Sequence, residues 1–435
     1  MIRLYDSASR TKREFEPGEP DRITLYVCGP TVYGRAHIGN ARPPVVFDVL
    51  RRLLEQQYPE RRVVFARNIT DVDDKIIAAA RAERVAPEEI TRRFEDAYLE
   101  DMRALGVRDP DLAPHATAEI PAMIAMIAEL IDRGHAYAAE GHVLFDVASD
   151  PEYGSLSRRD REAMLAGARV EVAPYKRAPG DFVLWKPSLP EVIGWDSPWG
   201  RGRPGWHIEC SAMIRAHLGQ TIDIHGGGID LLFPHHENEA AQSRCAHDAP
   251  LARYWMHNGF VDFGSEKMSK SVGNVVLVDE LLDQGHKGEV LRLALLSSHY
   301  RSPLPWTDGL IAQSRATLDG LYRRVRDAEA GEIDAEVLEA IADDLNTSLA
   351  LTRLGQIDDP AVLKASGALL GLFSETAENW FRGGEGADGV EAMIAQRNAA
   401  KAARDFVAAD QIRDTLKAEG ILLEDGPGGT TWRRA

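Results

Sequence analysis

Cysteine is scarce in this chain of 435 residues, which carries three thiols, at Cys28, Cys210 and Cys245. Thiols this few and this scattered do not form a disulfide framework, so we expect a reducing compartment and a cytoplasmic protein. The chain also lacks long apolar runs, at its N-terminus and elsewhere. We therefore expect no signal peptide and no contact with a membrane.

Positive charge is in the minority, with 51 Lys and Arg against 68 Asp and Glu and a net charge of −17. A chain this acidic is not expected to bind nucleic acid non-specifically. Basic pairs such as Arg323-Arg324 and Arg433-Arg434 can still contact a specific nucleic acid, although such pairs are more often ordinary solvated surface. The length and a 44% hydrophobic content predict several domains with real cores.

The segment 23–54 predicts a strand, a turn and a helix. An apolar, β-branched run over 23–27 is typical of a buried strand. The tetrad H-I-G-N at 37–40 follows, and apolar residues then recur at helical spacing. Pro43 and Pro44 are expected in the first turn of that helix, so the helix should begin close to the tetrad. A strand, a glycine-bearing turn and a helix N-terminus are typical of an anion site in many α/β folds.

Strands and helices alternate along much of the chain, which predicts an α/β fold with a doubly wound, Rossmann-like parallel sheet. The polar run N-I-T-D-V-D-D-K at 68–75 lies after a strand, where such folds bind ligands, although Thr and Asp are also good helix caps. The expected strands are 62–67, 221–225 and 254–261, the expected helices are 205–217 and 233–246, and 226–228 is expected to be a flexible glycine turn.

A possible metal site combines residues that are distant in sequence. His235 and Glu239 are four apart on a predicted helix and share one face. Cys28 and Cys210 lie at a strand end and a helix start, positions that a parallel sheet gathers along its carboxyl edge. Two thiolates, an imidazole and a carboxylate favour Zn²⁺. From spacing alone, His235 and Glu239 could also be an ordinary surface pair, and the two cysteines could be buried thiols without a metal. Cys245 is expected to be a core thiol.

The tetrad at 37–40 and K-M-S-K-S at 267–271 resemble the paired nucleotide motifs of class I aminoacyl-tRNA synthetases. The context Y-V-C-G-P-T-V-Y before the tetrad narrows the resemblance to the cysteinyl-tRNA synthetase family, and it extends from about Leu4 to the C-terminus. The usual tetrad of that family is H-I-G-H, whereas this chain has Asn40. An asparagine can donate a hydrogen bond but carries no charge.

This resemblance implies ATP-dependent activation of L-cysteine to cysteinyl-adenylate, followed by transfer to the 3′ end of tRNA(Cys). It implies Mg²⁺ with ATP and one Zn²⁺ per chain, and we expect a monomer. A pocket that merely fits the cysteine side chain gains roughly 1–3 kcal/mol over serine. Zinc can bind the substrate thiolate directly, so selection would need no editing domain. The implied zinc ligands are Cys28, Cys210, His235 and Glu239.

The resemblance also implies roles for residues near the two nucleotide motifs. Donors at a helix N-terminus and lysines on a closing loop would stabilise the charge that develops on the α-phosphate. Glycines at 226–228 would let the backbone approach the adenosine or would satisfy a tight turn. The implied catalytic residues are His37, Asn40, Lys267 and Lys270; the implied ATP contacts are His37, Gly39, Gly226, Gly227, Asp230 and Lys270; the implied amino-acid contacts are Gly29, Thr70 and Trp206.

Domain boundaries follow from changes in composition, including a shift to Ala, Leu, Glu, Asp and Arg from Leu310. The C-terminal region is expected to be all-helical, with exposed Trp and Arg side chains suited to stacking on unpaired bases. We expect a Rossmann-like catalytic domain at 1–114 and 205–265, an inserted subdomain at 115–204, a stem-contact region at 266–309, a helical bundle at 310–381 and an anticodon module at 387–435.

The sequence leaves two alternative functions open. One is the related cysteine ligase of mycothiol biosynthesis, which joins cysteine to an amino-sugar and lacks the anticodon module that residues 397–434 resemble. The other is a non-catalytic paralogue that binds tRNA or nucleotide. The intact His37, Lys267 and Lys270 and all four implied metal positions argue against the paralogue.

Overall fold

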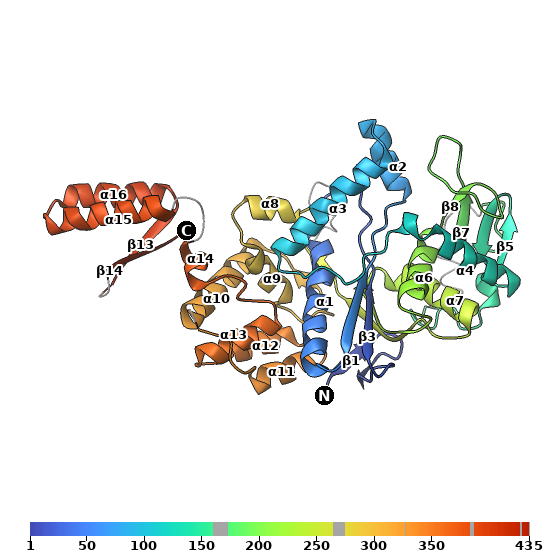
Figure 1. Ribbon diagram of the computed structural model, residues 1–435, viewed down its shortest axis with the longest axis horizontal. Coiled ribbons are helices and arrows are strands. Elements are labelled where there is room, and N and C mark those ends of the chain that lie inside the picture. The colour runs from blue at the N-terminus through green and yellow to red at the C-terminus, as the bar shows by residue number, and fades with distance from the viewer. Residues whose placement is uncertain (160–172, 264–274, 327, 383–386, 427–428, 435) are drawn as a thin grey trace.

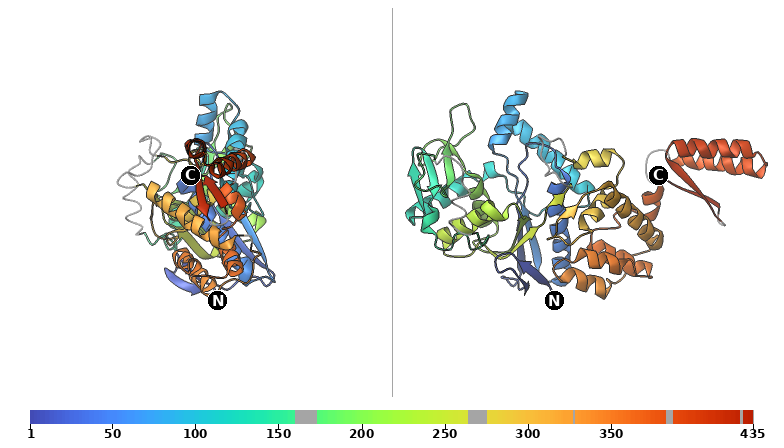
Figure 2. Two further views of the ribbon diagram at one scale, coloured as in Figure 1. Left: turned by 90° about the vertical axis from the view of Figure 1, so that its left-hand side faces the viewer. Right: turned by 180° about the vertical axis from the view of Figure 1, so that it is seen from behind.

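The computed structural model describes residues 1–159, 173–263, 275–326, 328–382, 387–426 and 429–434. The molecule is elongated, with a parallel sheet near its middle (Figure 1). An antiparallel subdomain flanks the sheet on one side and a helical bundle on the other. The C-terminal elements project beyond the bundle, at the far end from the antiparallel subdomain, in both face views (Figure 2). Among the described residues, no helix combines the length and apolarity that crossing a membrane requires.

The central sheet has four parallel strands in the order β10-β9-β3-β4. The strands β3 and β4 belong to the first part of the chain, and β9 and β10 to the part after the insert. The strand order therefore reverses between β3 and β9, which is the point where doubly wound folds bind ligands at the carboxyl ends of the strands. The bounds are β3 (Arg22–Val27), β4 (Arg62–Arg67), β9 (Ile222–Gly228) and β10 (Ala252–Asn258).

Helix α1 (Ile38–Gln57) begins at the predicted tetrad, with His37 as its N-cap. The placement of the prolines was wrong, because Pro43 and Pro44 lie inside the helix, in its second turn, rather than in the first. The two missing N–H groups cost backbone hydrogen bonds. The helix continues because it is buried along most of its length, and tertiary packing of this kind outweighs local propensity.

The glycines 226–228 are the last residues of β9 and not a flexible turn, which corrects the sequence prediction. A Cβ on Gly226 would lie 2.2 Å from the ring of Phe47 in α1. The glycine therefore allows α1 to pack directly on the sheet. The remaining elements of this domain are α2 (Asp74–Glu83), α3 (Pro87–Ala104), α6 (Trp206–His217), η3 (Leu232–His236), α7 (Glu237–His247), β11 (Val261–Asp262), α8 (Val278–Asp283), α9 (Gly288–Leu296) and β12 (Leu304–Pro305).

Two antiparallel units accompany the central sheet. A hairpin of β1 (Arg3–Asp6) and β2 (Thr11–Glu14) forms the N-terminus. The insert contains helix α4 (Ile120–Asp132) and a sheet of order β5-β6-β7-β8, which has its own apolar core around Phe145 and Trp185. Its strands are β5 (Ala136–Ala139), β6 (His142–Phe145), β7 (Phe182–Pro187) and β8 (Gly202–Pro204).

The C-terminal region is helical up to Ala418 and then ends in an antiparallel hairpin, so it is not all-helical as expected. Trp432 was expected to be exposed, but it is 3% exposed and packs with Val390 and Leu416 in a small separate core. The helices are α10 (Asp308–Val325), α11 (Ala335–Ala342), α12 (Thr347–Leu354), α13 (Pro360–Leu369), α14 (Ala377–Arg382), α15 (Ala387–Ala402) and α16 (Phe406–Ala418); the hairpin is β13 (Ile421–Gly426) and β14 (Gly429–Arg434).

Candidate active site and metal centre

The site lies where the strand order reverses, just beyond the end of β3. The backbone N–H of Cys28 donates to the carbonyl of Gly226 at 3.3 Å, which extends the pairing of β3 with β9. The next N–H, of Gly29, donates to Asn68 Oδ1 at 2.8 Å. A Cβ at Gly29 would lie 1.6 Å from the backbone oxygen of Asn68. Gly29 is therefore required for the loops after β3 and β4 to meet.

The four predicted metal ligands converge at this point. The two sulfurs of Cys28 and Cys210 are 3.9 Å apart, and Cys210 Sγ lies 3.6 Å from His235 Nε2. Glu239 Oε1 lies 2.9 Å from His235 Nε2 and 3.7 Å from Cys28 Sγ. All four ligand atoms lie within 4.8 Å of one another. The fold thus brings together four donors, of which the first and last, Cys28 and Glu239, are more than 200 residues apart in sequence.

The donor set fits a zinc ion. Two sulfurs bound tetrahedrally at about 2.3 Å would be about 3.8 Å apart, close to the observed separation of Cys28 and Cys210. Cys210, His235 and Glu239 are each no more than 1% exposed and Cys28 is partly buried, so three of the four donors are shielded from solvent. Two thiols and an imidazole are soft or borderline ligands that suit Zn²⁺ far better than Mg²⁺ or Ca²⁺.

The electrostatics of the cluster keep its carboxylate ionised. Burial alone raises the pKa of Glu239, but the facing imidazoles of His235 and His225 outweigh burial and hold this pKa well below its usual range. Burial and the neighbouring Cys210 raise the pKa of Cys28, whereas hydrogen bonding with Cys28 lowers the pKa of Cys210 to about 6. Burial lowers the pKa of His235, but Glu239 outweighs burial and raises this pKa to about 10. Metal ligands must be deprotonated, so Glu239 and Cys210 are already biased that way, whereas Cys28 and His235 would release protons when a metal binds.

Further histidines surround the four ligands, and the sequence analysis did not anticipate them as site residues. His225 Nε2 lies 2.8 Å from Glu239 Oε2, and His236 Nε2 lies 3.3 Å from Cys28 Sγ. These two histidines form a second possible ligand set with Cys28 and Glu239. His236 Nδ1 in turn contacts His257 Nε2 at 2.8 Å. The adjacent pair H-H at 235–236 gave no local signal of this, because neighbouring residues of a helix point in different directions and the contact of His236 is with the distant Cys28.

The expected amino-acid contacts border this cluster. The ring of Trp206 stacks on His235 with 4.1 Å between centroids, and Trp206 is 42% exposed. Thr70 is buried, and its hydroxyl donates to Glu209 Oε2 at 3.2 Å. Burial, together with the nearby Cys210, raises the pKa of Glu209 well above its usual range. Thr70 and Glu209 therefore form a polar wall beside the thiols, and Glu209 is a residue that sequence reasoning missed.

The tetrad at the start of α1 forms a reciprocal capping box. The backbone N–H of Asn40 donates to His37 Nδ1, and the backbone N–H of His37 donates to Asn40 Oδ1, both at 3.2 Å. Because Nδ1 of His37 accepts, its neutral ring carries the proton on Nε2, the form that can donate to a phosphate. The amide nitrogen of Asn40 can likewise donate, since its oxygen is the group that accepts.

Lys267 and Lys270 lie outside the described residues, but the chain that follows them is placed. The N–H of Ile38 donates to the carbonyl of Val276 at 2.9 Å, and the N–H of Val278 donates to that of Ala36 at 3.0 Å. The segment after K-M-S-K-S is thus paired directly with the segment that carries His37. Gly226 and Gly227 are buried in β9, and Asp230 is exposed just beyond that strand.

The fold and this arrangement define a class I aminoacyl-tRNA synthetase. The solved structure of Mycobacterium tuberculosis methionyl-tRNA synthetase with methionyl-adenylate has a similar fold, with a TM-score of 0.56 and 16% identity over 80% of this chain and 89% of that chain. Residues 14–316 match the family described as the class I (C) tRNA synthetase catalytic domain, and residues 384–433 match the cysteinyl-tRNA ligase anticodon-binding domain.

The chain belongs to the cysteine–tRNA ligase family. It is 59% identical to the cysteine–tRNA ligase of Parvibaculum lavamentivorans over 100% of this chain and 98% of the relative, and 56% identical to that of Caulobacter sp. (strain K31) over 99% of each. Residues 384–433 match an anticodon-binding domain. An amino-sugar ligase would not need such a domain, so this match argues against that alternative.

Proposed function

We propose that the chain activates L-cysteine with ATP and transfers it to tRNA(Cys), with zinc selecting the substrate thiolate. Cys28, Cys210, His235 and Glu239 would hold one zinc. When bound, zinc supplies a position for a soft thiolate that a serine hydroxyl fills poorly. The convergence of these four donors just beyond the end of β3 is the observation that carries the proposal. Cysteine-dependent exchange of pyrophosphate into ATP is the experiment that tests it.

The nearby side chains would position the amino acid for reaction. Trp206, stacked on His235, would border the cysteine together with Gly29 and the polar wall of Thr70 and Glu209. The cysteine carboxylate would attack the α-phosphorus of ATP, and pyrophosphate would leave. A hydroxyl at the tRNA 3′ end would then attack the carbonyl carbon, and AMP would leave.

The start of α1 would stabilise the charge that develops on the α-phosphate. His37 Nε2 and the amide of Asn40 are donors at a helix N-terminus, where the helix dipole also favours anions, and Gly39 lies between them in the first turn of α1. Lys267 and Lys270 would add positive charge, and Mg²⁺ would accompany the ATP. Gly226, Gly227 and Asp230, at the end of β9, would lie on the adenosine side.

The cellular setting belongs to the same proposal. The sulfurs of Cys28 and Cys210 must remain reduced to bind a metal, which favours the cytoplasm. The chain would act as a monomer, because every residue proposed for the site comes from a single copy.

We expect Asn40→His to be tolerated. Histidine is the residue that the family usually has here, and it can both accept from the N–H of His37 and donate to phosphate. The rate of cysteine-dependent pyrophosphate exchange should stay close to that of the parent chain. Asn40→Ala removes the donor and the acceptor for the His37 N–H together, and should lower this rate by about 10². An inactive Asn40→His variant would mean that the surrounding site differs from that of the family.

Ending the chain at Glu385 should separate activation from tRNA charging. The module beyond this point has its own core, and the proposed activation residues all precede it. Pyrophosphate exchange should remain largely intact. The half-saturating tRNA concentration should rise about tenfold or more, because each lost base stack is worth ~1–3 kcal/mol.

A point variant refines the truncation experiment. Phe406, at the start of α16, is 62% exposed and is an aromatic side chain suited to stacking on an unpaired base. Phe406→Ala in the full chain should raise the same tRNA concentration by a smaller factor. If the truncated chain charges tRNA at the same concentrations as the full chain, the module is not an anticodon reader.

A further inference from the structure

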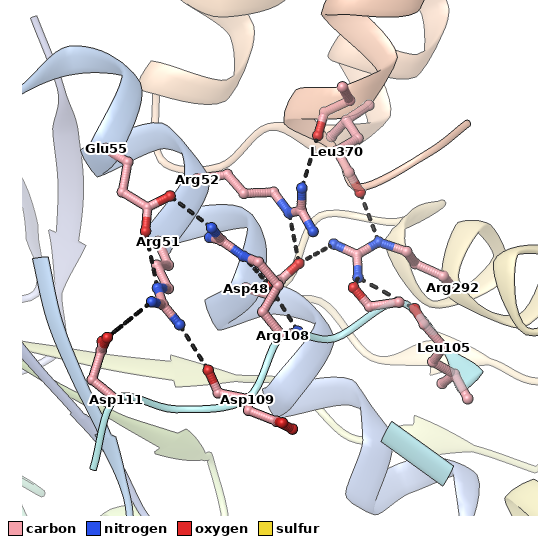
Figure 3. Close-up of polar contacts among 12 residues, drawn as sticks. Asp48, Arg51, Arg52, Glu55, Leu105, Arg108, Asp109, Asp111, Arg292 and Leu370 are labelled. Carbon is pink, nitrogen blue, oxygen red and sulfur yellow. Dashed lines mark hydrogen bonds and ion pairs between the residues drawn. The ribbon is translucent and has the colours of Figure 1, made fainter. Parts of the chain in front are cut away.

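A single buried carboxylate joins three arginines at the back of the catalytic helix. Asp48, in the middle of α1, is 1% exposed. It accepts from Arg52 Nε at 2.8 Å, from Arg108 Nε at 3.1 Å and from Arg292 Nη2 at 2.6 Å (Figure 3). The three guanidinium groups come from α1, from the loop after α3 and from α9. We refer to Asp48, Arg52, Arg108 and Arg292 as the Asp48 hub.

Arg292 extends the hub into the helical bundle. It is 0% exposed, and its Nε donates to the carbonyl of Leu370, at the C-terminal end of α13, at 2.7 Å. Its Nη1 donates to the carbonyls of Leu105 and Gly106, at 3.3 and 3.1 Å. A planar guanidinium is needed for this arrangement, because one side chain must reach three separate segments at fixed angles.

The bundle approaches the hub closely. Gly371 has a φ of +72°, and a Cβ there would lie 2.4 Å from the guanidinium of Arg292. Arg52 makes a second link, since its Nη1 donates to the carbonyl of Ala368 at 3.2 Å. Two arginines that share Asp48 therefore bind the last turn of α13, and the bundle is fixed to α1 through directional bonds as well as apolar packing.

The two helices that meet at the hub each connect to a nucleotide motif. Asp48 lies ten residues beyond Ile38, about 15 Å along α1 from the start of the helix. Helix α9 follows α8, which begins at Val278, directly after the segment paired with Ala36 and Ile38. The hub therefore links the bundle to the part of the chain that carries the proposed ATP site, while Asp48 itself lies about three helical turns from the cap at His37.

Stability alone does not account for such a cluster. Burial raises the pKa of Asp48, but Arg292 and Arg52 outweigh burial and lower it to about 2, so the carboxylate is ionised throughout the physiological range. Buried ion pairs gain little net stability over apolar packing because of the desolvation that they require. Directional ion pairs do fix the relative geometry of the groups that they join. A junction between the helical bundle and the catalytic domain needs such a fixed geometry.

We propose that Asp48, Arg52 and Arg292 are positioning residues that hold the helical bundle in register with α1, so that tRNA bound on the bundle delivers its 3′ end to the adenylate. This inference rests on the proposed function, and it adds that the bundle, which lies between α1 and the C-terminal module, contacts the bound tRNA (Figure 1). Activation of cysteine needs no such register, whereas transfer does. Perturbing the hub should therefore slow transfer selectively.

Arg52→Gln tests the inference with Arg51→Gln as a matched control. Arg52 is partly exposed and its loss leaves Arg108 and Arg292 on Asp48, so the variant should fold. Arg51 is the adjacent residue of α1, and it bonds Glu55, Asp109 and Asp111 but no bundle residue in the described chain. Arg52→Gln should lower kcat for aminoacylation about tenfold, while pyrophosphate exchange and tRNA affinity stay unchanged. Arg51→Gln should change none of the three.

Arg292→Lys provides a second variant with a larger expected effect. Lysine keeps a positive charge beside Asp48 but cannot bond Leu370, Leu105 and Gly106 together. A parallel fall of exchange and aminoacylation in both hub variants, or a loss of tRNA affinity at unchanged kcat, would overturn the inference. A parent chain that exchanges pyrophosphate but never charges tRNA would instead contradict the proposed function, and this outcome is visible before any variant is made.

Discussion

Cys210→Ser is expected to lose stoichiometric zinc and most of the preference for cysteine over serine. Cys210 is 1% exposed, and its sulfur lies 3.9 Å from that of Cys28 and 3.6 Å from His235 Nε2. A hydroxyl in this position is a poor zinc ligand. Without the metal, only the fit of the pocket discriminates, and the preference should fall to about 10–200-fold or less. Metal analysis and exchange assays with each amino acid measure the two effects.

Cys245→Ser is the matched control for this substitution. Cys245 is also a buried thiol, at 5% exposure, but it packs in the core of the insert, with Ala241 and Ala246, and belongs to neither ligand set found among the described residues. The control should retain zinc and selectivity. Retention of zinc by Cys210→Ser, or purified parent protein that contains no zinc, would contradict the assignment of the metal site.

Lys270→Ala is expected to lower the rate of adenylate formation by about 10²–10³ while weakening cysteine binding far less. The charge on the lysine is needed mainly as negative charge develops on the α-phosphate, so its loss affects the transition state more than the bound substrate. Single-turnover rates of adenylate formation and the apparent dissociation constant for cysteine separate these effects.

A lysine outside the nucleotide motifs serves as the control for Lys270→Ala. Lys12, in β2, pairs with Asp343 at 3.0 Å on the molecule's surface. Lys12→Ala should change neither the rate nor the cysteine affinity, since exposed ion pairs contribute little. Equal losses of rate and binding in Lys270→Ala, or an unchanged rate, would show that this lysine does not act on the transition state.

Local patterns were sufficient to predict the elements around the site. The β-branched run before Cys28 and the tetrad at 37–40 located β3 and the start of α1, because a strand and a capped helix each have a signature within a few residues. The spacing of His235 and Glu239 likewise placed two ligands on one face. These predictions needed no knowledge of distant contacts.

Features that depend on tertiary contact were missed. The glycines 226–228 resembled a turn in sequence, because nothing local signals that Phe47 of α1 occupies the space where a side chain of residue 226 would be. The same applies to His236, whose contact with Cys28 joins residues 208 apart. Pro43 and Pro44 were misplaced because burial of α1 outweighs their local preference.

The C-terminal hairpin was also not predicted, although the local sequence does contain a signal for it. The residues that flank the glycine-rich turn are rich in Leu and Thr and include Trp432, which favours strands over helix. Attention to the turn would have predicted β13 and β14. It would also have predicted a buried Trp432, since the indole closes the small core on which the hairpin packs.

The most direct test of metal-selected cysteine activation is pyrophosphate exchange by the full chain, measured with cysteine and with serine before and after zinc is removed and restored. We predict exchange with cysteine but very little with serine in the zinc-loaded protein. Removing zinc should abolish most of the difference between the two, and restoring zinc should recover it. Unchanged selectivity in protein shown to be free of metal would contradict the central claim.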